Sequence, residues 1–240
     1  MLDIHSHILP GVDDGSESIE ESIAILELMK KQGITDVIAT PHLYPHEDSL
    51  IDFLENSNNA YNDLKEAIKG KDLPNIYLGC EILYFEGMGN SRSLGSLCLN
   101  KSNYLLIELT DKCITESLMT NLLNLVDNIG IIPIIAHVER YFGSRKYRKF
   151  LKFLKKEEII VQINASSFCE NIFDRAIHKI FKYGIKTVIA TDAHSLEERP
   201  PKMTEAFKII RNKYGNAVVN EIIHNINEIK ENIDISGVTV

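Results

Sequence analysis

Near its N-terminus the chain reads Asp3-Ile4-His5-Ser6-His7, an alternation of polar and apolar residues that is followed by Pro10-Gly11. This pattern predicts a short β-strand that runs into a loop. Side chains two positions apart on a strand lie on the same face, so we expect His5 and His7 to project together, roughly 6 to 7 Å apart along the backbone. Two adjacent imidazoles can bind one metal ion, although an isolated His-x-His is more often a pair of surface histidines.

Similar groups recur along the chain, and this recurrence favours a metal site. Asp192-Ala193-His194 follows another predicted strand, and a single histidine or glutamate stands in or just after four other apolar runs. A carboxylate such as Glu81 or Glu108 within an apolar strand is costly to bury unless it is paired or bound to a cation. The candidate ligands are His5, His7, Asp14, His42, Glu81, Glu108, His137, Asp192 and His194, with Asp13 as the alternative to Asp14.

Length and composition set the broad class of the protein. A chain of 240 residues with 44% apolar content can bury one sizeable core, and we expect a single domain over residues 1–240. We expect no transmembrane helix, because no apolar run is long enough, and no signal peptide. The four cysteines form no CxxC motif and predict reduced thiols in a cytoplasmic protein. The net charge of −8 argues against non-specific nucleic-acid binding.

Predicted strands and helices alternate from end to end. Strands are expected at residues 2–5, 35–39, 76–83, 104–109, 131–136, 159–163 and 187–191, and helices at 18–33, 50–69, 116–128, 146–156, 173–183, 202–214 and on to about 230. Seven strands joined by right-handed helical crossovers predict a parallel sheet that closes or nearly closes. In such barrels the site lies at the C-terminal ends of the strands, where the candidate ligands also fall.

The ligand types indicate which ions and which substrate would fit. Nine nitrogen and oxygen ligands without a thiolate suit manganese, iron or zinc better than a structural zinc site. Nine are too many for one ion and fit two or three, with Glu81 as the candidate bridge. Four carboxylates carry about −4 and three divalent ions about +6, so the filled site would be positive and would suit a phosphate dianion. Metal-generated hydroxide would then attack phosphorus.

Seven short motifs resemble, in order, those of the polymerase and histidinol phosphatase (PHP) superfamily. They are His5-Ser6-His7, Asp13-Asp14-Gly15, Thr40-Pro41-His42, Gly79-Cys80-Glu81, Ile107-Glu108, the run from Ala136 to Tyr141 and the run from Thr191 to His194. The longer strings HSHILPGVDDG, ATPH, AHVERY, INASS and RPPKM resemble one branch, the bacterial metal-dependent protein tyrosine phosphatases of capsule and exopolysaccharide operons. The resemblance spans about residues 1 to 215.

This resemblance implies both a fold and a function. The fold would be α/β, a distorted seven-stranded (β/α)7 TIM-like barrel of the PHP type. The site would hold a trinuclear cluster, usually of Mn2+, with iron, zinc, cobalt or magnesium as alternatives. The reaction would be phosphotyrosine hydrolysis, with a bacterial tyrosine autokinase as substrate, and Arg140 and Arg199 match family arginines that hold the phosphoryl group. A homo-oligomer is compatible with this reading, and neither nucleic acid nor membrane insertion is expected.

Other functions within the superfamily stay open. The same metals serve histidinol phosphatases, which act on a small phosphomonoester, but those proteins are generally longer and lack the HVERY and RPPKM strings. A further class comprises proofreading nucleases and inactive domains attached to polymerases. The length and acidic charge of this chain argue against that class. A metal-stabilised binding module without turnover would lack some of the ligands, and here none is missing.

A different phosphatase chemistry is suggested by Cys169 and Arg175, which have the C-x5-R spacing of cysteine-dependent tyrosine phosphatases. Such a loop needs small residues whose backbone N–H groups converge on phosphate around a thiolate. Here Glu170 and Asp174 would place negative charge beside the phosphate, and the loop contains no glycine. We therefore interpret the spacing as a chance match.

Overall fold

The computed structural model describes residues 1–110, 113–143, 146–170 and 173–232, and shows an α/β fold. The strands are β1 (Leu2–Ser6), β2 (Asp36–Ala39), β3 (His42–Leu43), β4 (Asn75–Leu78), β5 (Glu81–Leu83), β6 (Tyr104–Glu108), β7 (Ile132–Ile135), β8 (Ile160–Asn164) and β9 (Thr187–Ala190). The α-helices are α1 (Ile19–Lys31), α2 (Leu50–Ala67), α3 (Glu116–Asn124), α4 (Tyr147–Lys156), α5 (Ala165–Glu170), α6 (Asp174–Tyr183), α7 (Met203–Tyr214) and α8 (Asn216–Asn232). Short 3-10 or π segments are η1 (Met88–Asn90), η2 (Arg92–Leu97), η3 (Leu99–Lys101), η4 (Leu125–Ile129) and η5 (Val138–Gly143).

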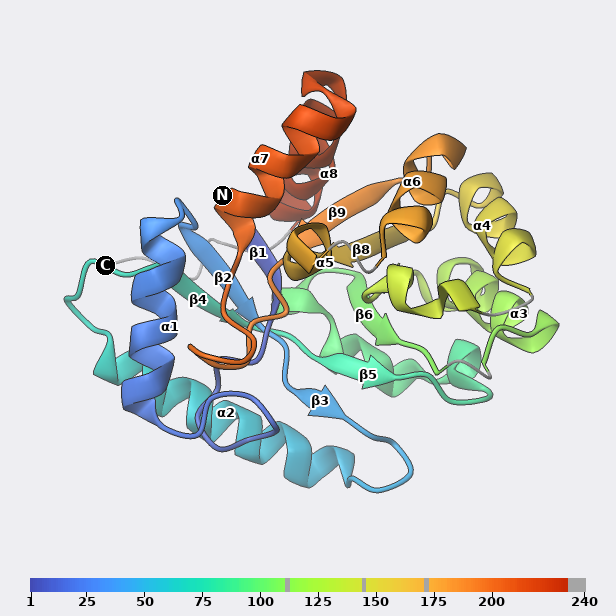
Figure 1. Cartoon of the computed structure of the whole chain (residues 1–240). Coiled ribbons are helices and arrows are strands. Elements are labelled where there is room, and N and C mark those ends of the chain that lie inside the picture. The colour runs from blue at the N-terminus through green and yellow to red at the C-terminus, as the bar shows by residue number, and fades with distance from the viewer. Residues whose placement is uncertain (111–112, 144–145, 171–172, 233–240) are drawn as a thin grey trace.

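The strands form two parallel sheets. One has the order β1-β2-β4, and the other the order β3-β5-β6-β7-β8-β9. The sheets meet where β1 passes β9, through a bridge between Ser6 and Ala193 and a 2.8 Å hydrogen bond from the His7 N–H to the Ala193 carbonyl. Figure 1 shows the helices outside this framework, with α1 and α2 beside the smaller sheet and α7 and α8 beside β9. Nearly all the strand residues are buried, as expected of parallel strands covered by helices.

The prediction of one closed seven-stranded barrel is not confirmed. The described residues contain nine strands in two sheets that do not close into a ring. The strand expected at 76–83 breaks into β4 and β5 around Gly79, where an added Cβ would lie 2.8 Å from the Leu99 side chain and 3.0 Å from that of Ile38. The chain changes sheets at this crowded point, and β3 changes sheets in the same way just after β2 and Pro41.

Helix boundaries follow from capping groups that are visible in the sequence. The Ser18 hydroxyl accepts the Glu21 N–H at the start of α1, and the Glu21 carboxylate accepts the Glu17 N–H at 3.0 Å. These bonds satisfy backbone donors that have no partner within the helix. The face of α1 that carries Ile25 and Met29 is buried against the core. The predicted helix at 18–33 is therefore confirmed with slightly shorter bounds.

Polar side chains of helix α8 contact the amino ends of two strands. Near its end the Lys230 Nζ lies 2.7 Å from a carboxylate oxygen of Asp36, the first residue of β2. The Asn225 side chain donates to the Thr187 carbonyl, at the start of β9, over 2.8 Å. No helix in the described part of the chain has both the length and the apolar character that crossing a membrane requires.

The opposite, carboxyl ends of the strands gather polar residues. Two of the segments that leave these ends contain non-glycine residues with positive φ, which are uncommon in proteins. His137, after β7, has φ +30°, and Asp192, after β9, has φ +52°. Such conformations persist where the surrounding structure imposes them, and they concentrate at functional sites.

Candidate metal centre

All nine predicted ligands lie together at the carboxyl ends of the strands. In the following groups, one ligand atom from each residue lies within 4.8 Å of the others: His5 with His7, Glu81 and Asp192; His7 with Asp14, His42 and His194; and His42 with Glu81 and Glu108. The ninth residue, His137, joins through its Nε2, 2.9 Å from Glu81 Oε1 and 3.5 Å from Glu108 Oε1. The predicted assembly of these side chains is thus observed, whereas their binding of metal stays a prediction.

Glu81 lies at the centre of this cluster. Its Oε2 is 2.9 Å from His5 Nε2 and 3.2 Å from His7 Nε2, while its Oε1 faces His137. The side chain is 1% exposed. Burial would raise the pKa of Glu81, but the charge of His5 in its protonated form and the hydrogen bonds from the surrounding histidines lower it well below its usual range. A ligand that bridges two ions needs a buried carboxylate whose two oxygens both face other ligands, and Glu81 has this arrangement.

Gln162 fixes the tautomer that His5 adopts when its ring is neutral. The Gln162 Oε1 accepts the backbone N–H of His137 at 2.7 Å, so this atom must be the amide oxygen. The same oxygen lies 3.1 Å from His5 Nδ1, which must therefore carry the hydrogen. The Nε2 of a neutral His5 is then an unprotonated lone pair that faces Glu81.

Two further imidazoles are oriented in the same way. His7 Nδ1 lies 2.7 Å from Asp13 Oδ2, and His194 Nδ1 lies 3.0 Å from the carbonyl of Asp192. Both partners accept hydrogen bonds, so each Nδ1 donates and each neutral ring directs an Nε2 lone pair into the cluster. Metal-binding histidines are held in this manner, because the second nitrogen sets the tautomer.

Two imidazole nitrogens in the cluster have no hydrogen-bond partner among the described residues. They are Nδ1 of His42 and Nε2 of His194, and both are buried. Leaving a polar atom buried without a partner costs free energy, and most such atoms in native proteins are satisfied. Divalent cations at the two positions would accept these lone pairs, so the donor set fits the metal ions predicted from the sequence.

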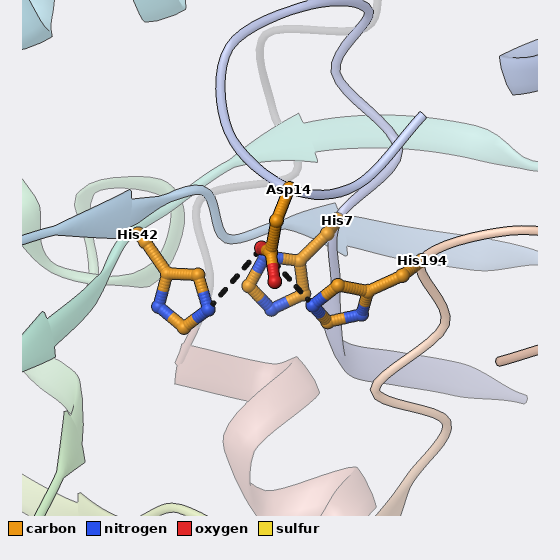
Figure 2. Close-up of side chains that lie close together, drawn as sticks. All are labelled: His7, Asp14, His42 and His194. Carbon is orange, nitrogen blue, oxygen red and sulfur yellow. Dashed lines mark ion pairs between the residues drawn. The ribbon is translucent and has the colours of Figure 1, made fainter. Parts of the chain in front are cut away.

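Asp13 and Asp14 are adjacent but have different surroundings. Asp13 accepts from His7, and also from the backbone N–H of His42 at 3.0 Å. Burial would raise the pKa of Asp13, but the hydrogen bond to His7 and the charge of that ring in its protonated form lower it to about 2. Asp14 instead points at His42 Nε2 and His194 Nε2, 3.6 and 3.4 Å away, from a loop above the cluster (Figure 2). Asp14 therefore stays the predicted ligand of the two, and Asp13 orients His7.

The two predicted arginines reach the cluster from different segments. Arg140 in η5 and Arg199 before α7 both donate through Nη2 to Asp192 Oδ2, over 2.9 and 2.6 Å. The other oxygen of Asp192 faces His5 at 3.3 Å. Both arginine side chains are more than a third exposed, at 38% and 36%. Each guanidinium thus touches the cluster and also borders its open side.

Comparison with known proteins agrees with this site. Residues 1–230 match the family described as capsular polysaccharide synthesis, CpsB/CapC. The chain belongs to the CpsB/CapC family. A relative in Streptococcus pneumoniae, named tyrosine-protein phosphatase CpsB, is 33% identical over 239 residues, which cover 92% of this chain and 94% of the relative.

Solved structures extend the comparison to the fold of this CpsB/CapC chain. A crystal structure from work on YwqE of Bacillus subtilis and CpsB of Streptococcus pneumoniae, described as metal-dependent tyrosine phosphatases, matches with a TM-score of 0.83 and 25% identity, and covers 98% of this chain and 96% of that one. The histidinol phosphate phosphatase of Lactococcus lactis matches with a TM-score of 0.59 and 16% identity over 88% of this chain and 92% of that one. The second likeness shows the fold alone.

The CpsB/CapC site also contains polar residues that the sequence reasoning did not select. Gln162 fixes His5, the Asn164 amide donates to Asp192 Oδ2 at 2.6 Å, and the Tyr141 oxygen lies 3.1 Å from His137 Nδ1. Gln162 and Asn164 are 0% and 2% exposed on the otherwise apolar strand β8. The sequence could have indicated them through their spacing of two residues, because this spacing places two polar side chains on one face of a buried strand.

In the CpsB/CapC chain, Cys169 has surroundings unsuited to a nucleophile. It lies in α5, and its thiol donates to the Ala165 carbonyl at 3.7 Å. Burial, with the nearby charge of Glu205, raises the pKa of this thiol to about 11. A reactive cysteine needs a lowered pKa. Residues 171–172 of the C-x5-R segment lie outside the described residues, and the described end of the segment supports the interpretation of a chance match.

Proposed function

We propose that this CpsB/CapC chain is a metal-dependent protein-tyrosine phosphatase that hydrolyses the phosphate monoester of phosphotyrosine in a protein. The observation that carries the proposal is the arrangement of His5, His7 and His194, whose Nδ1 atoms are tied to acceptors while their Nε2 atoms face carboxylates of the cluster. The name of the Streptococcus pneumoniae relative, a tyrosine-protein phosphatase covered over 94% of its length, supports the substrate class.

The nine clustered side chains would hold two or three divalent ions. We propose manganese as the metal, with iron, zinc, cobalt and magnesium as alternatives, because the donors are nitrogen and oxygen without sulfur. The residues that would bind the ions are His5, His7, Asp14, His42, Glu81, Glu108, His137, Asp192 and His194. Such ions, when bound, polarise phosphoryl oxygens and lower the pKa of water so that it becomes a nucleophile near neutral pH.

The arginines bind and orient the phosphoryl group in this proposal. Arg140 and Arg199 already share one oxygen of Asp192, which holds their guanidinium groups at the edge of the cluster. The N–H groups that remain can form paired hydrogen bonds with phosphoryl oxygens, a geometry that guanidinium matches well. Positive charge held in place beforehand stabilises the charge that builds up on the transferred group.

A cavity beside the cluster offers a place for the tyrosine ring of the substrate. It has a volume of about 520 Å³, and its lining includes Asp14, His42, Tyr44 and Phe53. The Tyr44 ring stacks on His42 with 5.2 Å between ring centres. Aromatic rings pack well against one another in offset or tilted arrangements. We place the leaving tyrosine here because the cavity combines aromatic surface with direct access to the cluster.

The cellular setting is also part of the proposal. We propose a bacterial tyrosine kinase of capsule or exopolysaccharide synthesis as the phosphorylated partner, because the family is described by capsular polysaccharide synthesis. A cytoplasmic location is supported by the cysteines, all four of which are free thiols. Neither a nucleic acid nor a membrane is required by the site described above.

Metal dependence and substrate class can be tested in one set of assays. Hydrolysis of a phosphotyrosine peptide should stop after treatment with EDTA and should return when Mn2+ is added. His5→Ala should lose both bound metal and most activity, because it removes an inner nitrogen ligand. Full turnover after exhaustive chelation would disprove the metal mechanism. Faster turnover of histidinol phosphate than of the peptide would transfer the assignment to a small phosphomonoester.

A further inference from the structure

We propose a second ligand site, outside the metal cluster, that binds a small organic anion with an apolar body. The site is a cavity of about 370 Å³ between α2, β4 and the segment from η2 to η3, referred to below as the α2–β4 cavity. Its volume lies within the range typical of small-molecule sites. The proposal does not depend on the phosphatase assignment.

A buried hydroxyl without a partner lines the α2–β4 cavity. Ser57 on α2 is 1% exposed, and its Oγ has no hydrogen-bond partner among the described residues. A hydroxyl buried in this way costs free energy unless something satisfies it. A ligand in the cavity could accept its hydrogen and would remove that cost.

Two lysines give the α2–β4 cavity a positive charge. Lys65 on α2 and Lys101 at the end of η3 both line it, and within the described ranges no carboxylate lies in ion-pair distance of either. Within the described residues, the Lys65 ammonium donates to the Tyr61 hydroxyl at 3.4 Å and lies over the same ring. None of the described lining residues is acidic. On a chain of net charge −8, an unbalanced pair of lysines on one cavity favours an anionic ligand.

The cavity beside the metal cluster has the opposite character. Its lining includes five acidic residues, Asp13, Asp14, Glu47, Asp48 and Asp52. Phe53 is the one residue found in both linings. The two cavities are thus neighbours whose linings differ in charge.

The rim of the α2–β4 cavity is held in an unusual backbone conformation. Asn100 and Lys101 are consecutive non-glycine residues with φ of +41° and +60°, and both line the cavity. Left-handed conformations are disfavoured for such residues and persist where the local structure determines them. The effect here is to bring the Lys101 backbone to the same opening as Lys65.

The remaining lining determines the shape of the ligand. The walls are apolar or aromatic and include Phe53, Tyr61, Tyr77, Leu78 and Leu97. Ligand sites commonly combine such walls with a few polar groups that fix orientation. The ligand class that fits is therefore an aromatic or branched apolar group that carries a sulfonate, phosphate or carboxylate, with the anion at the lysines and an acceptor oxygen near Ser57.

Binding can be measured with 4-fluorobenzenesulfonate as the probe, by fluorine NMR titration of the intact protein loaded with Mn2+ and, in parallel, of the protein treated with EDTA. The probe should bind in both states. Sulfate, which lacks the apolar body, and 4-fluorobenzenesulfonamide, which lacks the charge, should both bind at least about tenfold more weakly, a difference of ~1.4 kcal/mol. Equal affinity for sulfate or for the sulfonamide would overturn the proposed ligand class.

Variants locate the probe. The double variant Lys65→Met with Lys101→Met should weaken binding of the probe about tenfold or more, because it removes both charge-assisted hydrogen bonds. Lys69→Met is the matched control: it is also an exposed lysine near the end of α2, it pairs with Glu66, and it does not line the cavity. It should bind the probe like the wild type. Binding that survives the double variant but is lost in Arg140→Ala would place the probe at the metal cluster and reject the proposed site.

Ser57→Ala gives an independent measurement. Because the hydroxyl has no partner in the empty cavity, its removal should leave stability unchanged or slightly raised in urea unfolding. The same substitution should weaken probe binding a few-fold, on the order of one neutral hydrogen bond. Unchanged probe affinity together with a loss of stability would show that the hydroxyl has a structural partner, and would remove this part of the argument.

Discussion

Gly15 is the position where the smallest side-chain addition should most disturb the metal cluster. It follows Asp13 and Asp14 and packs against the backbone of His7. A Cβ placed on Gly15 would lie 2.2 Å from the His7 carbonyl oxygen and 2.5 Å from the His7 Cβ. Ordinary contact begins at 3.4 Å, so the two segments must separate by about 1.2 Å. Backbone atoms cannot rotate away as a flexible side chain would.

Gly15→Ala should therefore reduce both stability and metal binding. Overpacking of a well-packed region costs about 1–3 kcal/mol in the free energy of unfolding. The displacement also separates His7 from Asp13, which orients its ring, and loss of such support lowers metal affinity by roughly 10- to 100-fold. Urea unfolding in EDTA measures the first effect without contribution from bound metal. Titration with Mn2+ measures the second.

Gly95→Ala is the control for this prediction. Gly95 lies in η2, an added Cβ there meets nothing within 4 Å, and its φ is not in the left-handed region. Its substitution should change the free energy of unfolding by no more than about 0.5 kcal/mol. If Gly15→Ala unfolds and binds Mn2+ as Gly95→Ala does, the close packing of the loop on His7 does not shape the cluster.

Three further predictions concern other parts of the molecule. Arg140→Ala and Arg199→Ala should each reduce turnover of a phosphotyrosine peptide roughly 10²-fold while metal content is kept, which is the scale for losing one transition-state donor; loss of metal would instead make the arginine a support for the ligands. Cys169→Ser should keep activity within about a few-fold, because its thiol lies in a helix and takes no part in the site; an inactive, well-folded variant would restore the cysteine mechanism. Lys230→Met should cost about 1 kcal/mol at pH 7, since the lysine is partly exposed and the ion pair is screened. Burial would raise the pKa of Asp36, but the hydrogen bond from Lys230 dominates and lowers it, so the stabilisation is present above the unfolded-state pKa of about 3.9 and is lost as the pH falls through the lower folded-state pKa. Urea unfolding in EDTA should show the difference between wild type and variant shrinking below about pH 4, and a constant difference would count against the ion pair.

The site could be predicted from the sequence more fully than the fold could. His5 and His7 are two apart on a strand, and Glu81 and Glu108 are charges in apolar runs, so local pattern alone selects them. The reason that these side chains lie together is a general property of parallel sheets, because the carboxyl ends of the strands meet at one edge. The structure brings together every side chain that these two rules selected.

The strand count depends on contacts that no local pattern contains. The break at Gly79 results from its packing against Leu99 and Ile38, which are distant in sequence. Strand β3 has only two residues, too few to show any periodicity. The separate roles of Asp13 and Asp14 were open for a similar reason, because the partners that distinguish them, His42 and His194, lie on other elements.

The contact between β1 and the end of β9 has a consequence for how the chain is made. Asp3 on β1 is fully buried and accepts the backbone N–H of Thr191 at 3.0 Å, a contact between residues 188 positions apart. Contacts of such large sequence separation form late in folding, because loop closure costs entropy before the contact stabilises the chain. At 5–20 residues per second, about 10 to 40 s separate the synthesis of the two partners. During that interval the β9 side of β1 has no partner, and an unpaired edge of an apolar strand is prone to aggregate. His5 and His7 thus leave the ribosome well before the residues that enclose them have been made.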